Sequence, residues 1–129
     1  MIIKNGNVFL DGKIKKCDVS FSQTITGIGE FTGEDYIDAE GKFVFPGFVD
    51  IHTHGGGGGD FMDAEEDSFD KALRFHAENG TTSLLATSVT APVEDIEKML
   101  AVTRKYMMKE ELNGARVIGA HVEGPYISL

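Results

Sequence analysis

Residues 43–54 read FVFPGFVDIHTH, an apolar run that ends in two histidines one residue apart, and five glycines follow at residues 55–59. A β-strand points residues i and i+2 to the same face, so His52 and His54 are predicted to leave the end of a buried strand side by side. Neutral imidazole is a common ligand of zinc and iron. The stretch therefore predicts a metal site at the end of a strand. The alternative is a pair of solvent-exposed histidines.

The glycine run at residues 55–59 has two interpretations of equal weight. Five consecutive glycines cost backbone entropy when they are ordered, which favours a loop that approaches a ligand closely. The other interpretation is a flexible linker. The run is not a phosphate-binding P-loop, because no Lys-Ser or Lys-Thr pair follows it.

The residues before this stretch predict short strands. Residues 1–45 carry short apolar runs separated by turn signals such as Asn5-Gly6 and Asp11-Gly12. Strands with this length and spacing are typical of a small sandwich or sheet. Residues 1–45 are therefore predicted to form part of a small β-sandwich domain.

The residues after it predict an α/β segment over residues 46–129, in which strands alternate with helices. Five elements follow one another: a buried strand at 48–51, a helix from 67 or 68 to 80, a strand at 81–89, a helix from 92 that ends before 113, and a strand at 116–123. Alternation of this kind implies parallel strands with right-handed crossovers. Either a doubly wound sheet or a barrel satisfies it.

The last of these strands carries a second group of polar residues. His121 and Glu123 are predicted to share a face with Val117 and Gly119. A carboxylate at the carboxyl end of a parallel strand lies where barrel enzymes keep their active-site groups, although an exposed glutamate is the simpler alternative. His121 is either a group that orients a ligand or a hydrogen-bonded core histidine. His76, on the apolar side of the first helix, is predicted to be a core or boundary histidine rather than a ligand.

Composition excludes several classes of partner. The 129 residues include 12 basic and 21 acidic side chains, a net charge of −9, which argues against nucleic acid and anionic membranes as partners. No apolar stretch approaches the roughly 20 residues of a membrane span, and the N-terminus does not resemble a signal peptide. The single cysteine, Cys17, has no internal disulfide partner, which favours a cytoplasmic location.

Two motifs carry a resemblance to a known family. Residues 46–54, PGFVDIHTH, together with the lead-in IDAEGK at residues 37–42, resemble the signature of the amidohydrolase superfamily at its first barrel strand. Residues 121–125, HVEGP, and residues 80–83, GTTS, resemble the N-acetylglucosamine-6-phosphate deacetylase family within that superfamily. The resemblance covers essentially the whole chain.

This resemblance implies a metal centre and a reaction. Glu123 corresponds to the metal-binding glutamate of the family, and His52 and His54 to the pair that some members use for a second metal. The implied cofactor is a divalent metal, zinc or iron(II), as one or two ions. The implied reaction is hydrolysis of N-acetylglucosamine 6-phosphate to glucosamine 6-phosphate and acetate. The implied assembly is a homodimer, and the implied partner is the phosphorylated amino-sugar substrate.

The resemblance also implies that residues 1–129 are an N-terminal fragment. Family members are nearly three times longer and take two further histidine ligands, a catalytic aspartate and their phosphate-binding groups from later strands and loops. Residues 46–129 are thus expected to form the first three strands and two helices of a metal-dependent hydrolase (β/α)8 TIM barrel, with no catalytic acid or base among them. The alternatives are another metal-dependent amidohydrolase and an inactive truncated product.

Overall fold

The computed structural model of the chain describes residues 1–126. It contains two compact units, Met1–Pro46 and a second unit that begins at Gly47. The first unit is built from strands, and the second mixes strands with helices. Within residues 1–126, no helix is long and apolar enough to cross a membrane.

The first unit is a single five-stranded sheet. Its strands are β1 (Ile2–Leu10), β2 (Lys13–Phe21), β3 (Ile25–Gly29), β4 (Tyr36–Asp38) and β5 (Phe43–Val44). The sheet has the order β3-β2-β1-β4, and β5 also pairs with β1. Asp11 and Gly12 form the turn between β1 and β2 with φ values of 50° and 75°, as in a tight hairpin. The short strands expected here are confirmed as one sheet layer, and the predicted sandwich stays a prediction.

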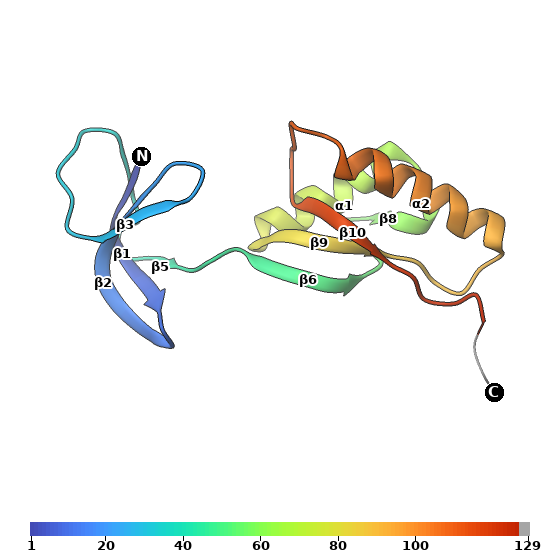
Figure 1. Cartoon of the computed structure of the whole chain (residues 1–129), viewed down its shortest axis with the longest axis horizontal. Coiled ribbons are helices and arrows are strands. Elements are labelled where there is room, and N and C mark those ends of the chain that lie inside the picture. Colours follow the sequence, from blue (N-terminus) through green and yellow to red (C-terminus); the bar gives the residue numbers. More distant parts are fainter. Residues whose placement is uncertain (127–129) are drawn as a thin grey trace. The chain divides into compact units, whose positions relative to one another are not determined.

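The second unit contains a parallel sheet with the order β10-β9-β6. Its strands and helices alternate along the chain: β6 (Phe48–Thr53), α1 (Glu66–Glu78), β9 (Thr81–Thr87), α2 (Val93–Met107) and β10 (Arg116–His121). Figure 1 shows both helices over the same face of this sheet. The predicted alternation is therefore confirmed, with element boundaries within a few residues of those expected.

The helix ends follow local chemistry. Glu66 and Asp67 place negative charge in the first turn of α1, where the helix dipole favours it. Asn79 caps the end of α1, and Gly80 follows with a φ of 90°, which a glycine adopts without strain. Pro92 precedes the first turn of α2, where its missing N–H costs nothing.

The core of the second unit lies between the helices and the sheet. Its largest members come from every layer: Phe61, Phe69, Leu84, Met99, Tyr106 and Val117. The Phe69 ring centroid lies 4.8 Å from that of Phe61 and 5.0 Å from that of Tyr106. These aromatic contacts join α1 and α2 above the middle strand.

The prediction of a buried strand at residues 48–51 is wrong on burial. The strand forms, but Phe48, Val49 and Ile51 are 57%, 59% and 64% exposed. Among residues 1–126, β6 pairs with β9 alone, so its other edge has no neighbouring strand there. An apolar run in a sequence shows that a strand is suited to burial. The strands and helices packed around it decide whether it is buried.

The glycine run has a structural explanation that neither interpretation named. Its residues form a small hairpin of β7 (Gly55–Gly56) and β8 (Gly59–Asp60) that packs on α1. A Cβ atom at Gly59 would overlap the carbonyl group of Ser68 in α1. The hairpin therefore lies directly against the helix backbone, and the glycines allow that approach.

Candidate metal centre

Three side chains with metal-binding atoms meet at the carboxyl ends of β6 and β10. His52 and His54 come from the end of β6, and Glu123 follows β10 by two residues. His52 Nε2 lies 3.2 Å from Glu123 Oε2, and His54 Nε2 lies 3.5 Å from the same oxygen. One ligand atom from each of the three residues lies within 4.8 Å of the others. The structure thus brings together the three residues that the sequence singled out.

The geometry of this group suits a divalent metal. Two atoms bound to one tetrahedral zinc at about 2.1 Å lie about 3.4 Å apart, close to the separations of 3.2 and 3.5 Å in this group. His54 Nδ1 is buried and has no hydrogen-bond partner among residues 1–126. The side chains of His52, His54 and Glu123 are 48%, 39% and 44% exposed in this chain. Two imidazoles and a carboxylate are among the ligand types that bind zinc in proteins.

His121 lies beside this group without being a member of it. Its Nδ1 donates to the Ile51 carbonyl oxygen at 2.9 Å, and its ring centroid is 4.3 Å from that of His52. A carbonyl oxygen only accepts, so this bond places the ring hydrogen on Nδ1. His121 therefore ties β10 to β6 next to a candidate ligand, which favours the orienting role over the core histidine.

His76 is a hydrogen-bonded boundary residue, as predicted. Its Nε2 lies 3.1 Å from the Gly55 carbonyl oxygen and 3.1 Å from Thr53 Oγ1. These bonds join α1 to the residue between the two histidines and to the residue just after them. His76 is not part of the group of metal-binding atoms.

The expected face of β10 needs a correction. Val117 pairs with Leu84, whereas Gly119 pairs with Leu85 and His121 with Thr87, so the register shifts between Val117 and Gly119. A shift of one residue moves a side chain to the other face of the sheet. Val117 is consequently buried in the helix-covered core and does not share a face with His121.

Sequence reasoning missed two residues at the end of β9. Thr87 and Ser88 are both fully buried, and their hydroxyl groups bond the backbone on either side of the metal-binding group. The available signal was a Thr-Ser pair directly after the apolar part of a strand. Small hydroxyl residues are common at strand ends, so the pattern alone does not mark them.

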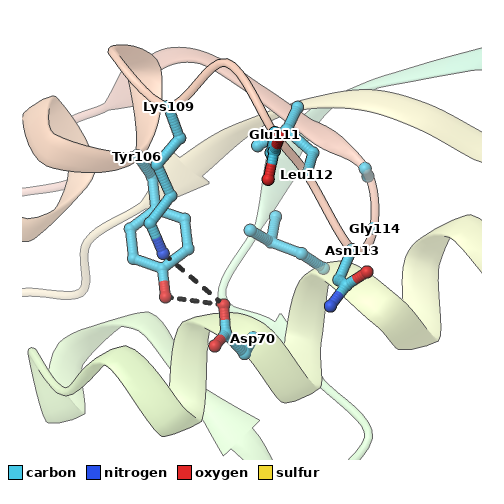
Figure 2. A pocket seen from close by; sticks show the side chains of 9 residues that line it. Asp70, Tyr106, Lys109, Glu111, Leu112, Asn113 and Gly114 are labelled. Atoms are coloured by element: carbon cyan, nitrogen blue, oxygen red, sulfur yellow. Dashed lines mark hydrogen bonds and ion pairs between the residues drawn. The ribbon is translucent and has the colours of Figure 1, made fainter.

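A second polar cluster of this unit lies away from the histidines. Figure 2 shows it in a pocket between α1, the end of α2 and the loop before β10. The Tyr106 hydroxyl donates to Asp70 Oδ1 at 2.7 Å, and Lys109 Nζ lies 3.8 Å from the Tyr106 ring centroid. Burial raises the pKa of Tyr106, and the hydrogen bond to Asp70 raises it further. This pocket shares no residue with the metal-binding group.

Comparisons with known proteins agree with the site. Residues 35–110 match the model of the amidohydrolase family. The N-acetylglucosamine-6-phosphate deacetylase of Vibrio furnissii is 39% identical over 108 residues, which are 81% of this chain and 27% of that protein. The enzyme of the same name from Bacillus subtilis (strain 168) is 37% identical over 130 residues, which are 98% of this chain and 31% of that protein.

A solved structure of an enzyme with the same activity in its name is also similar to this chain. A mutant N-acetyl-D-glucosamine-6-phosphate deacetylase from Mycobacterium smegmatis, in complex with N-acetyl-D-glucosamine-6-phosphate, matches with a TM-score of 0.77 and 27% identity over 99% of this chain and 33% of that chain. The chain spans 27% and 31% of the length of the two curated relatives. The chain belongs to the amidohydrolase family.

Proposed function

We propose that this chain is the N-terminal part of an N-acetylglucosamine-6-phosphate deacetylase, which hydrolyses its substrate to glucosamine 6-phosphate and acetate. One observation carries the proposal. The two histidines of the PGFVDIHTH motif and the glutamate of the HVEGP motif, far apart in sequence, come within ligand distance of one another. The similarity to enzymes of that name over 98% of this chain supports the same assignment.

The proposed metal is zinc or iron(II), as one or two ions, with His52, His54 and Glu123 among its ligands. When bound, such an ion lowers the pKa of water to about 7 and polarises an amide carbonyl group. Glu123 contributes the negative charge of the ligand set, and the two imidazoles bind as neutral donors. None of the three is proposed as the general acid or base. The family resemblance assigns that role to an aspartate of a later strand.

The fold of the second unit supports a (β/α)8 barrel. Three parallel strands with both connecting helices on one face are the arrangement expected of the first units of such a barrel, which supports the proposal. Barrel enzymes keep their active sites at the carboxyl ends of the strands, where the metal-binding group of this chain lies. The first unit is proposed to belong to the small β-sandwich domain of the family. A homodimer in the cytoplasm is the proposed form of the complete protein.

The proposed substrate is a phosphorylated amino sugar. The mutant Mycobacterium smegmatis enzyme was solved with N-acetyl-D-glucosamine-6-phosphate bound, which supports the same substrate for this protein. The groups that bind the phosphate are proposed to come from later loops. The net charge of −9 argues against nucleic acid and anionic membranes as partners.

The test begins with the intact mass of the purified protein. A mass near 14.0 kDa predicts an inactive chain that still binds zinc, and a mass about three times larger predicts an active enzyme. For the larger protein, acetate release is measured with N-acetylglucosamine 6-phosphate, unphosphorylated N-acetylglucosamine and a cyclic imide. Chelation of the metal is expected to abolish acetate release, and zinc or iron(II) to restore it.

The outcomes distinguish the alternatives. Hydrolysis of the cyclic imide instead of the amino sugar would contradict the proposed substrate and favour another metal-dependent amidohydrolase. A protein of the larger mass that binds no metal and hydrolyses neither substrate would overturn the proposed function. Association and poor solubility of a 14.0 kDa product would favour the truncated, inactive alternative, because an open sheet exposes its edges.

A further inference from the structure

The middle strand of the second unit supplies no atom to the metal-binding group, yet it runs between the two strands that do. Strand β9 lies between β6 and β10 in the sheet. The last residue of β9, Thr87, and the next residue, Ser88, are both 0% exposed. Buried hydroxyl groups need hydrogen-bond partners, and the partners of these two lie in the segments that carry the histidines and the glutamate.

Thr87 holds the segment that carries the two histidines. Its Oγ1 accepts the backbone N–H of Thr53 at 2.9 Å, and it donates to the Leu85 carbonyl oxygen at 3.4 Å. Thr53 is the residue between His52 and His54, so the bond fixes the peptide that joins the two candidate ligands. With one bond accepted and one donated, the buried hydroxyl group has a partner for its hydrogen atom and for one lone pair.

Ser88 holds the residue that carries the carboxylate. Its Oγ accepts the backbone N–H of Glu123 at 2.9 Å and lies 3.2 Å from the Glu123 carbonyl oxygen. The Ser88 backbone N–H also donates to the His121 carbonyl oxygen at 3.0 Å. The backbone of Glu123 is therefore held on both sides of its Cα atom by one side chain.

Hydroxyl groups are needed here because the backbone ladders end. The last pair between β6 and β9 joins Thr53 to Ala86, after a register shift that begins at Asp50. The last pair between β9 and β10 joins His121 to Thr87. At these ends, the side chains of Thr87 and Ser88 bond the backbone of Thr53 and Glu123, in addition to the backbone bond from Ser88 to His121. Because Thr87 and Ser88 are consecutive and both buried at the end of β9, the two anchors stand at a fixed separation from each other.

We propose that Thr87 and Ser88 are positioning residues that set the separation of Glu123 from His52 and His54. This inference rests on the proposed metal centre. Groups that orient ligands change metal affinity without touching the ion, typically by about 10- to 100-fold. Loss of either hydroxyl group is expected to weaken zinc binding about tenfold, at the lower end of this range, because both groups act on the backbone of the ligands.

The test compares three variants with one matched control in the protein as purified. Thr87→Val and Ser88→Ala remove a hydroxyl group, and Thr87→Ser retains it. Thr103→Val is the control, because Thr103 is also buried and its hydroxyl group bonds only within α2. Zinc affinity is measured by competition with a chromophoric chelator, the cobalt(II) absorption spectrum reports ligand geometry, and thermal unfolding of the metal-free protein reports stability.

The inference predicts a specific pattern. Thr87→Val and Ser88→Ala lose about tenfold in zinc affinity and alter the cobalt spectrum, whereas Thr87→Ser restores both to wild-type values. Thr103→Val lowers thermal stability about as much as Thr87→Val and Ser88→Ala do. It leaves zinc affinity and the cobalt spectrum unchanged. If Thr87→Val does not fold, Ser88→Ala carries the comparison, because it removes a single oxygen atom.

Two results would overturn the inference, and they are distinguishable. A wild-type protein that binds zinc, with Thr87→Val and Ser88→Ala matching Thr103→Val in affinity and spectrum, would reduce both residues to an ordinary structural role. A wild-type protein that binds neither zinc nor iron(II) would overturn the proposed metal centre and the inference with it.

Discussion

The second unit contains two polar clusters that are built in different ways. In the cluster between the helices, the Tyr106 hydroxyl donates to Asp70, and Lys109 lies over the Tyr106 ring. In the cluster at the carboxyl ends of the strands, His52 and His54 both face one oxygen of Glu123, and His54 Nδ1 has no partner among residues 1–126. Only the first cluster satisfies its own polar groups.

This difference separates stability from binding. Polar groups that pair with one another stabilise the fold and have little left for a ligand. Two imidazoles and a carboxylate gathered around one point are ligand types that can bind a metal ion there. We therefore expect changes between the helices to lower the free energy of unfolding, and changes at the strand ends to lower metal affinity.

The largest expected effect is on the packing beneath the cluster between the helices. Phe69 is fully buried against Phe61 and Tyr106, so Phe69→Ala is expected to lower the free energy of unfolding by about 3–5 kcal/mol. Zinc affinity of the folded protein is expected to stay at the wild-type value. Urea unfolding checks the first expectation and chelator competition the second. A loss below about 1 kcal/mol would contradict the assigned core.

The next effect is at the strand ends. Glu123→Gln removes the charged ligand, and zinc affinity is expected to fall by more than the roughly 100-fold that loss of an orienting group can cause. The unfolding midpoint of the metal-free protein is expected to stay unchanged, because Glu123 is 44% exposed. Glu111→Gln, in the pocket between the helices, is the matched control and should leave zinc affinity intact. Equal affinities of the two variants would rule out Glu123 as a ligand.

A smaller effect is expected from the tyrosine hydroxyl alone. Tyr106→Phe keeps the ring packing and removes the donor to Asp70, which is expected to lower the free energy of unfolding by about 1–2 kcal/mol. Zinc affinity is expected to stay the same. Asp70→Asn tests the same bond from the other side. A change in zinc binding in either variant would show that the two clusters are coupled.

The smallest effect is a dependence on pH. Burial and the hydrogen bond to Asp70 raise the pKa of Tyr106 above its ordinary value near 10. The unfolded chain therefore ionises this group at lower pH than the folded protein does, so its contribution to stability is complete below about pH 10 and is lost as the pH rises above that value. Unfolding measured from pH 8 to 11 should show this decline in the wild type and a weaker one in Tyr106→Phe. Identical pH profiles of the wild type and Tyr106→Phe would contradict a raised pKa of Tyr106 in the folded protein.

Much of the fold could be predicted because its signals are local. Gly80 just after the end of α1, the position of Pro92 and the apolar spacing of α1 and α2 are local signals, and the structure confirms these helices. The pair His52 and His54 was also visible, since one residue separates them. Glu123 could be connected with them only through a motif that resembles a known family, because it lies 71 positions after His52.

The amino-acid sequence by itself determined the kinds of element, their order, and three candidate ligands. The tertiary structure decided which side chains of these elements lie in the core and which are exposed. A register shift turns Val117 away from the face of His121, and Val49 and Ile51 are exposed on β6, which pairs with β9 alone among residues 1–126. It also placed Thr87 and Ser88 against both ligand segments. Alternation and helical spacing are properties of one segment, whereas strand register, edges and hydroxyl contacts exist only between segments that folding brings together.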